Sequence, residues 1–404
     1  MNDQLYMARA IQLAQQGLYT THPNPRVGCV IVKDGQIVGE GFHARAGQAH
    51  AEVFALRQAG ELAQGATAYV TLEPCAHFGR TPPCANALVE AKVARVVMAS
   101  LDSNPLVAGK GQAILENAGI QTRVGVLEDQ AKALNKGFFR RMQGGLPYVR
   151  LKTAASLDGR TAMQSGESKW ITGTDARKDV QKLRAQSGAV ITGIGTVLAD
   201  NPSLTVRPED WLDWHYGDVV QPLRVVFDSQ LATPIDAQLL STQGVIIVTQ
   251  QSLEHAKARA LQTKGVDIWS FEGREGVLQQ VLTKLAQRGV NEVLVEAGAN
   301  LAGAFIQAKL VDELIVYLAP TLLGSNARPM FNLPLSQMAE QYRLQQTDLR
   351  MVGQDIRLTF CLNPHFSLCF DIHFPQAKNL LCLLALLNPL VMSNKLPHVV
   401  VTFV

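Results

Sequence analysis

Hydrophobic and polar positions in the first 145 residues follow two periodicities, one typical of helices and one of strands. Met7, Ile11, Ala14 and Leu18 recur at helical spacing, which predicts an amphipathic helix rather than the unbroken apolar segment of a secretory leader. Short apolar runs predict strands at 27–33, 37–42, 68–72 and 95–100. Further helices are predicted at 51–59, 85–91, 107–118 and 128–143. This order predicts an α/β fold with helices packed around a central sheet.

The pattern is interrupted by Gly144, Gly145 and Pro147, and a new strand begins at Tyr148. Strands are then predicted at 148–154, 188–193, 223–227, 245–249, 292–296 and 314–319, with helices at 277–288 and 301–308. Because glycine and proline mark linkers between domains, we predict a first domain at 1–145 and a second at 146–363. Residues 364–404 carry few charges and a leucine-rich stretch, and we predict a tail of unknown role there.

Composition narrows the class of protein. A chain of 404 residues with 47% hydrophobic and 18% charged residues can bury the cores of two domains. A formal net charge of +3 is too small for a dedicated nucleic-acid binder, and the longest apolar run, at 380–387, is too short to span a bilayer. Six cysteines in a chain of this length do not suggest a disulfide scaffold, so we expect a cytoplasmic protein. We also expect it to act on a small molecule, without nucleic-acid or membrane partners.

A candidate metal site is formed by His50, Cys75 and Cys84, with Glu52 beside it. One imidazole and two thiolates supply three of the four tetrahedral positions of zinc and leave the fourth for water. Bound zinc lowers the pKa of that water, and a nearby carboxylate can carry protons between water, a ring nitrogen and ammonia. The residue types therefore predict a zinc-dependent deaminase with Glu52 as its catalytic residue.

The spacing leaves alternatives. Zinc deaminases of nucleobases carry His-x-Glu with Pro-Cys-x-x-Cys, whereas eight residues separate Cys75 from Cys84 here. A closed structural zinc site could recruit Cys29 or His77, but it would not explain Glu52. The other open readings are a deaminase of nucleic-acid bases or nucleotides with an accessory domain, and a non-catalytic zinc protein that binds a nucleotide.

The second half carries weaker signals. It lacks a Gly-x-Gly-x-x-Gly turn after its first strand, so the usual dinucleotide fingerprint is absent. Small residues at 297–303 and 193–196 follow predicted strands and could bring backbone N–H groups close to a phosphate, although such turns are also common structural features. Arg184 and Arg207 are candidate phosphate ligands because guanidinium groups bind phosphate through two parallel hydrogen bonds.

Several longer motifs resemble one family. They are HPNPRVG at 22–28, HAE at 50–52, EPCAHFGRTPPC at 73–84, LKTAASLDG at 151–159, DNPSL at 200–204 and VEAG at 295–298. Together they are similar to the bifunctional deaminase–reductases of riboflavin biosynthesis, in which the long insert between the cysteines is the usual form of the motif. The resemblance covers roughly residues 1–362 and leaves the tail unexplained.

The resemblance implies an N-terminal cytidine-deaminase-like α/β/α sandwich and a C-terminal dihydrofolate-reductase-like α/β domain. It implies zinc held by His50, Cys75 and Cys84, Glu52 as proton carrier, NADPH as second cofactor, a phosphoribosyl pyrimidine as substrate and a homo-oligomer. The implied NADPH contacts are Ala154, Trp170, Thr196, Asp200, Ser229, Gly298, Ala299, Asn300, Leu301, Ala302, Gly303 and Ala304. The implied substrate contacts are Ser168, Arg184, Leu204, Arg207 and Glu296.

Overall fold

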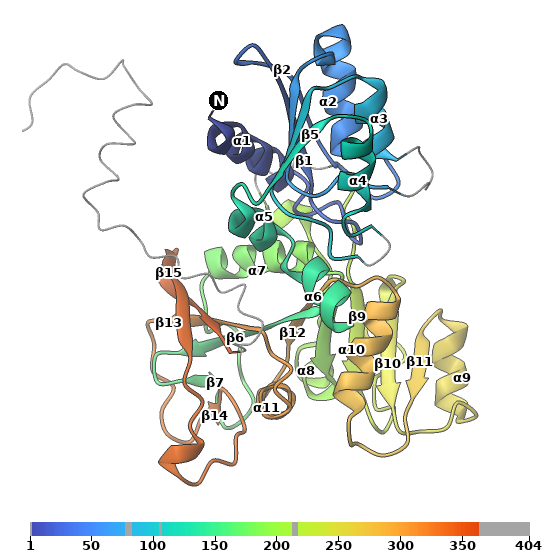
Figure 1. Cartoon of the computed structure of the whole chain (residues 1–404). Helices are drawn as coiled ribbons and strands as arrows, with labels where there is room; N and C mark the ends of the chain where they lie inside the picture. The colour runs from blue at the N-terminus through green and yellow to red at the C-terminus, as the bar shows by residue number, and fades with distance from the viewer. Residues whose placement is uncertain (1, 77–82, 105–106, 212–216, 363–404) are drawn as a thin grey trace, which may run out of the picture. The chain divides into compact units, whose positions relative to one another are not determined.

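The computed structural model describes residues 2–76, 83–104, 107–211 and 217–362. Two mixed sheets, each covered by helices, account for most of this part of the chain (Figure 1). The predicted tail at 364–404 lies outside the described residues, as does the proposed alternative ligand His77.

The first sheet has the strand order β2-β1-β3-β4-β5. Its strands are β1 (Gly28–Lys33), β2 (Gln36–Phe42), β3 (Thr67–Val70), β4 (Arg95–Met98) and β5 (Gln121–Val124). The first two form an antiparallel hairpin, β1 pairs antiparallel with β3, and β3, β4 and β5 run parallel. The central strands are rich in β-branched residues because a sheet covered on both faces buries every side chain along them.

Helices cover both faces of this sheet. They are α1 (Asp3–Gln15), α2 (Ala51–Ala59), α3 (Cys84–Glu90), α4 (Lys110–Asn117), α5 (Glu128–Leu134) and α6 (Lys136–Gly144). Apolar residues of α2, α3 and α4 share one core with the sheet, and those of α1 and α5 share the other. The predicted α/β sandwich is thus confirmed as three layers.

The single helix predicted at 128–143 is wrong, because Asn135 breaks it into α5 and α6. The backbone of Asn135 leaves the helical region at φ −121°, and its side chain accepts from the Arg26 N–H and donates to the Arg26 carbonyl. The Asn135 side chain is thus tied to a distant loop by two hydrogen bonds, and periodicity alone does not reveal such a contact.

The second sheet has the order β11-β10-β9-β8-β12-β6-β13-β16-β15. Its strands are β6 (Tyr148–Ser156), β8 (Ala189–Gly193), β9 (Leu223–Phe227), β10 (Val245–Thr249), β11 (Asp267–Ser270), β12 (Glu292–Glu296), β13 (Glu313–Ala319), β15 (Gln345–Val352) and β16 (Asp355–Cys361). A separate ribbon pairs β7 (Arg160–Ala162) with β14 (Arg328–Pro329). The seven strands from β11 to β13 in this order run parallel to one another. Strand β16 pairs antiparallel with both of its neighbours, β13 and β15.

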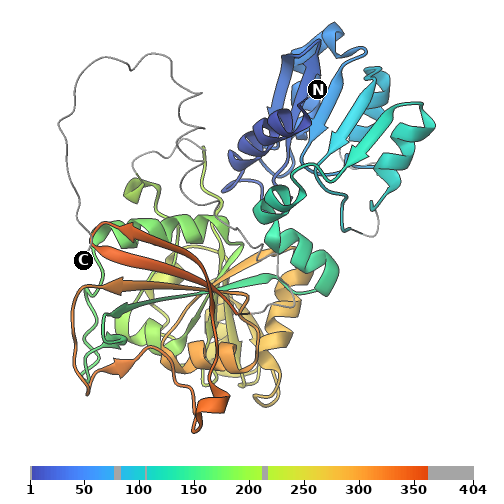
Figure 2. The same cartoon turned by 60° about the vertical axis from the view of Figure 1, so that its left-hand side comes forward.

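Five α-helices belong to this half among the described residues: α7 (Thr174–Gln186), α8 (Ile194–Asp200), α9 (Ala256–Thr263), α10 (Val277–Gln287) and α11 (Ala299–Gln307). In Figure 2 the green α7 covers one face of the sheet and the orange α11 the other. The core clusters agree, since α10 and α11 pack on one face and α7, α8 and α9 on the opposite one. The chain order reverses where β8 and β12 lie side by side, and ligands of open α/β sheets bind at such a point.

Candidate active sites

The predicted metal ligands meet at the amino ends of two helices. His50 directly precedes α2, Cys84 opens α3, and Cys75 lies in the loop after β3. The His50 Nδ1 atom is 3.6 Å from the Cys75 Sγ and 3.3 Å from the Cys84 Sγ, and the three ligand atoms all lie within 4.8 Å of one another. Three residues far apart in sequence therefore form a single N/S donor set.

The local electrostatics favour a thiolate in this cluster. A hydrogen bond from the Cys84 side chain, and then His50, lower the pKa of Cys75, while the same pairing raises the pKa of Cys84. The backbone N–H of Cys84, in the first turn of α3, also donates to the Cys75 Sγ at 3.3 Å. Because metal binding requires deprotonated sulfur, this environment suits zinc.

Glu52 points into the same cluster from the first turn of α2. It is only 3% exposed, and burial raises its pKa to about 7, with the nearby Cys75 adding to the shift. Its Oε2 atom is buried without a hydrogen-bond partner among the described residues. A buried carboxylate oxygen needs a partner, and a metal-bound water would provide one, so the donor set and Glu52 together fit an open zinc site.

Cys29 is not part of the donor set. It lies in β1, is fully buried and belongs to the apolar core, where burial raises the pKa of its thiol. Its alternative role as a fourth ligand is wrong for the described residues, because the metal-ligating group comprises only His50, Cys75 and Cys84.

Sequence reasoning did not single out His43 beside this site. Its ring lies edge-on to the ring of His50, with centroids 5.3 Å apart. His43 Nδ1 is 3.1 Å from the Ala49 carbonyl, and His43 Nε2 is 3.0 Å from the Asn24 Nδ2. Asn24 belongs to the motif at 22–28, and that motif was the available signal. His43 itself lies outside these motifs, and a single histidine near the end of a strand does not by itself indicate a functional site.

The second site is a cavity of about 1660 Å³ beside the second sheet. The junctions where β8 passes into α8 and β12 into α11 both line it, at Gly193–Thr196 and Gly298–Leu301. Helices α8 and α11 begin at these junctions, and the N-terminal end of a helix attracts phosphate through its free N–H groups. The cavity therefore has the position and the backbone groups that a dinucleotide requires.

Most residues expected to contact cofactor or substrate line this one cavity. The expected cofactor residues on its wall are Ala154, Trp170, Thr196, Asp200, Ser229, Gly298, Ala299, Asn300, Leu301 and Ala304. The expected substrate residues on its wall are Ser168, Arg184, Leu204, Arg207 and Glu296. They come from strands, helices and loops spread over residues 154–304, and the fold brings them together.

Ala302 and Gly303 do not line the cavity. Ala302 is 1% exposed and packs in the core between α11 and the sheet. A Cβ on Gly303 would lie 2.2 Å from the Asn332 carbonyl oxygen, so this glycine allows close backbone packing.

A buried ion cluster lies on the cavity wall. The Arg184 guanidinium donates to both oxygens of Glu296, at 2.6 and 3.0 Å. Burial opposes ionisation of Glu296, but the positive charge of Arg184 still keeps the pKa of this carboxyl below its ordinary value. Lys152, which sequence reasoning missed, lies 4.0 Å from Glu296, and burial lowers the pKa of its amine. Lys152 belongs to the motif at 151–159, and that motif was the available signal for it.

Arg207 is the more accessible of the two predicted phosphate ligands. Its side chain is 44% exposed and pairs with Asp210 at 2.6 Å, whereas the Arg184 side chain is 12% exposed and held by Glu296.

In the part of the chain that the structure describes, no helix combines the length and the apolar character needed to cross a membrane.

Two family models match the chain. The cytidine and deoxycytidylate deaminase zinc-binding region matches residues 1–100, and the RibD C-terminal domain matches residues 147–358. The first match contains His50, Cys75 and Cys84, and the second contains the residues that line the cavity.

Relatives match over both halves. The riboflavin biosynthesis protein RibD of Haemophilus influenzae is 50% identical over 89% of this chain and 97% of its own length. The protein of the same name from Escherichia coli is 52% identical over 89% of this chain and 99% of its own length.

Solved structures agree in fold. RibD of Acinetobacter baumannii has a TM-score of 0.83 and 54% identity, and it covers 89% of this chain and 99% of its own. The diaminohydroxyphosphoribosylaminopyrimidine deaminase/5-amino-6-(5-phosphoribosylamino)uracil reductase of Thermotoga maritima has a TM-score of 0.78 and 32% identity over the same shares. With both halves matched in sequence and in structure, the chain belongs to the RibD family of bifunctional deaminase and reductase enzymes of riboflavin biosynthesis.

Proposed function

We propose that His50, Cys75 and Cys84 hold the zinc ion of this deaminase and that Glu52 carries the protons. The unpartnered, buried Oε2 of Glu52 beside the three ligand atoms is the observation that carries this assignment. Zinc, when bound, lowers the pKa of a coordinated water and so supplies hydroxide near neutral pH. The closed structural zinc site is not favoured, because it would leave this carboxylate oxygen without a partner.

The deamination consumes one water and releases one ammonia. It converts 2,5-diamino-6-(5-phosphoribosylamino)pyrimidin-4(3H)-one to 5-amino-6-(5-phosphoribosylamino)uracil, so a C–NH₂ group becomes a carbonyl. Glu52 can accept a proton at Oε2 and return it to the ring nitrogen and then to the departing amine. A pKa of about 7 suits both directions of transfer, because neither protonation state is strongly favoured.

We propose that the cavity of the second half binds NADPH and the deaminated product. NADPH supplies the hydride when bound. The loops at Gly193 and Gly298 offer backbone N–H groups to its phosphates, and Arg207 offers an exposed guanidinium to the phosphate of the substrate. Glu296, fixed by Arg184, contacts the substrate from the wall. The ribosyl group gains a hydride and a proton and becomes a ribityl group.

The remaining proposals concern the domain bounds, the tail, the cellular compartment and the partners. We propose a deaminase domain at 1–145, a reductase domain at 146–363 and a tail of unknown role at 364–404; the separate cores of the two sheets support the division. We also propose a cytoplasmic homo-oligomer without a nucleic-acid partner. The net charge of +3 supports the last point. Leu349 and Met351, exposed on the edge strand β15, support self-association.

The test compares Glu52→Ala with Glu61→Ala, which removes an exposed carboxylate outside the cluster. Each variant receives the diaminopyrimidine ribosyl phosphate while ammonia, NADPH oxidation and bound zinc are measured. We expect Glu52→Ala to retain zinc, to release no ammonia and to oxidise NADPH only when given the pre-deaminated substrate. Glu61→Ala should behave as the unaltered chain. Unchanged ammonia release by Glu52→Ala would overturn the assignment of Glu52.

A further inference from the structure

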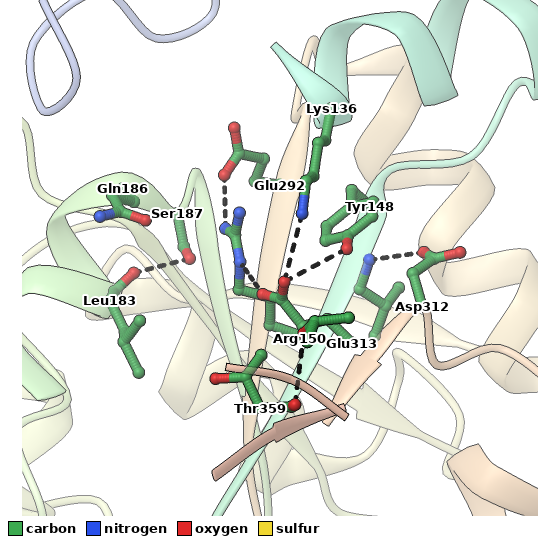
Figure 3. A network of polar contacts seen from close by, with 12 residues as sticks. Lys136, Tyr148, Arg150, Leu183, Gln186, Ser187, Glu292, Asp312, Glu313 and Thr359 are labelled. Atoms are coloured by element: carbon green, nitrogen blue, oxygen red, sulfur yellow. Dashed lines mark hydrogen bonds and ion pairs between the residues drawn. The ribbon is translucent and has the colours of Figure 1, made fainter. Parts of the chain in front are cut away.

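A buried ionic network spans the start of the second sheet. Figure 3 shows Arg150 of β6 between Glu292 of β12 and Glu313 of β13. The Arg150 guanidinium donates to Glu292 Oε2 at 2.5 Å and to Glu313 Oε2 at 2.7 Å, and Lys136 lies 3.4 Å from the Glu313 Oε1. This leaves the second oxygen of Glu292 for another partner.

That partner is Arg26, from the motif at 22–28. Arg26 Nη1 donates to Glu292 Oε1 at 2.5 Å and to the Leu134 carbonyl at 2.6 Å. The Arg26 and Glu292 side chains are only 9% and 3% exposed. Removing either charge would leave the other buried without full compensation, which is costly in a protein interior. Glu292 therefore holds the loop at Arg26 firmly in place.

The reductase half contacts the same loop at two further positions. The Asn291 side chain donates to the Pro23 carbonyl at 2.7 Å. Gly188 lies so close to His22 that a Cβ there would be 2.4 Å from the imidazole Cε1 atom. Residues 22–26 of the deaminase half are thus contacted by Gly188, Asn291 and Glu292, and the Gln186 carbonyl accepts a further hydrogen bond from Arg26 Nη2 at 3.4 Å.

The other side of this loop faces the zinc site. Asn24, between Pro23 and Arg26, donates from Nδ2 to His43 Nε2 at 3.0 Å. His43 in turn binds the carbonyl of Ala49, and its ring lies edge-on to His50, the residue after Ala49. Contacts therefore run without a gap from Glu292 through the loop to a zinc ligand.

We propose that Glu292, a residue of the reductase sheet, is a positioning residue for the deamination. It fixes Arg26 and with it the loop that places Asn24 against His43 beside His50. A displacement of this loop would move His43 relative to the zinc site, and displacements of about 1 Å near reacting groups can cost about 100-fold in rate. The inference rests on the proposed function of the zinc cluster.

The test compares Glu292→Gln with Glu313→Gln. Both remove one buried carboxylate charge from the same network, but Glu292 binds Arg26 of the loop at 22–26, whereas Glu313 binds Arg150 and Lys136. The probe is the diaminopyrimidine ribosyl phosphate, with ammonia release, NADPH oxidation on the pre-deaminated substrate, bound zinc and the melting temperature measured for each variant. We expect Glu292→Gln to lower kcat for ammonia release about tenfold at unchanged zinc content. NADPH oxidation should fall no further than in Glu313→Gln.

A double-mutant cycle separates positioning from a general loss of stability. If Glu292 acts through Arg26, the pair Arg26→Met and Glu292→Gln should lower ammonia release no more than either change alone. Arg26→Lys should keep a higher kcat for ammonia release than Arg26→Met, because lysine retains the positive charge that Glu292 binds. Additive losses, or equal losses of both activities in Glu292→Gln, would show that Glu292 merely stabilises the sheet, and the inference would fail.

The two proposals fail in different ways. If the unaltered chain releases no ammonia, or if Glu52→Ala still does, the assignment of the zinc cluster fails. If the unaltered chain releases ammonia, Glu52→Ala does not, and Glu292→Gln matches Glu313→Gln, then only the positioning role of Glu292 is overturned.

Discussion

Arg184 on α7 and Glu296 at the end of β12 form a two-point ion pair on the wall of the reductase cavity, with N–O distances of 2.6 and 3.0 Å. The pair joins a helix to the strand whose following loop is proposed to hold NADPH. Sequence reasoning assigned both residues to the substrate separately. Their pairing means that Arg184 sets the orientation and the charge of Glu296.

Replacing Arg184 with methionine should impair the reductase half. The change leaves Glu296 with only Lys152, 4.0 Å away, so the buried carboxylate loses most of its compensation. Breaking a buried pair on one side costs about 3–5 kcal/mol of stability. We expect a lower melting temperature and at least a tenfold lower kcat/KM for NADPH oxidation, with ammonia release retained.

The matched change is Arg207→Met. Its 44% exposed side chain pairs with Asp210, and such surface pairs contribute about 1 kcal/mol or less. The melting temperature should therefore stay near that of the unaltered chain, while KM for the phosphorylated substrate rises. Equal destabilisation by both substitutions would argue against the buried pair.

Zinc removal should separate the two activities. The three ligand atoms lie within 4.8 Å of one another in the first half, and none of these residues lines the reductase cavity. After chelation and dialysis, ammonia release should cease while oxidation of NADPH on the pre-deaminated substrate continues. Adding zinc back should restore ammonia release. Loss of both activities at the same chelator concentration would contradict this separation.

Two glycines near the proposed phosphate site should respond differently to alanine. Gly303→Ala places a Cβ 2.2 Å from the Asn332 carbonyl oxygen, and such overpacking costs about 1–3 kcal/mol. At Gly298 an added Cβ meets nothing within 4 Å, so Gly298→Ala should leave stability unchanged. We expect calorimetry to show a lower melting temperature only for Gly303→Ala. Titration with NADPH should show weakened binding for Gly298→Ala, because the methyl group occupies space beside the loop N–H groups.

The stabilising contribution of Glu292 to the free energy of unfolding should be lost at acid pH. Burial opposes its ionisation, but the charges of Arg26 and Arg150 lower its pKa to about 2 in the folded chain, below the ordinary value of 4.5. Between these values the unfolded chain binds the proton and the folded chain does not, so stability is lost as pH falls from 4.5 towards 2. A shift of this size corresponds to about 3 kcal/mol. Urea unfolding at pH 6 and pH 3 should show the stability gap between Glu292→Gln and the unaltered chain shrinking at low pH; a constant gap would refute the linkage.

Helices and strands could be predicted from the sequence wherever burial makes apolar residues recur at a regular spacing. Fully buried parallel strands such as β10 are continuous β-branched runs, and amphipathic helices such as α1 and α10 carry an apolar stripe. Such patterns arise from the spacing of side chains along one element, so no other part of the chain is needed to recognise them. Polar or half-exposed elements, including α7, α9 and β15, have no clear stripe and were missed.

The sequence by itself determined the donor set of the proposed zinc site. Only a few residue types bind zinc, and His50, Cys75 and Cys84 with Glu52 match that chemistry at any distance along the chain. The tertiary structure alone decided what depends on contacts between distant segments. Asn135 divides a helix because it binds Arg26, Glu296 is held by Arg184, and Glu292 joins the loop at 22–26 to the second sheet. The partners of a buried charge are chosen by the packing of the whole fold, and no pattern within one element records that choice.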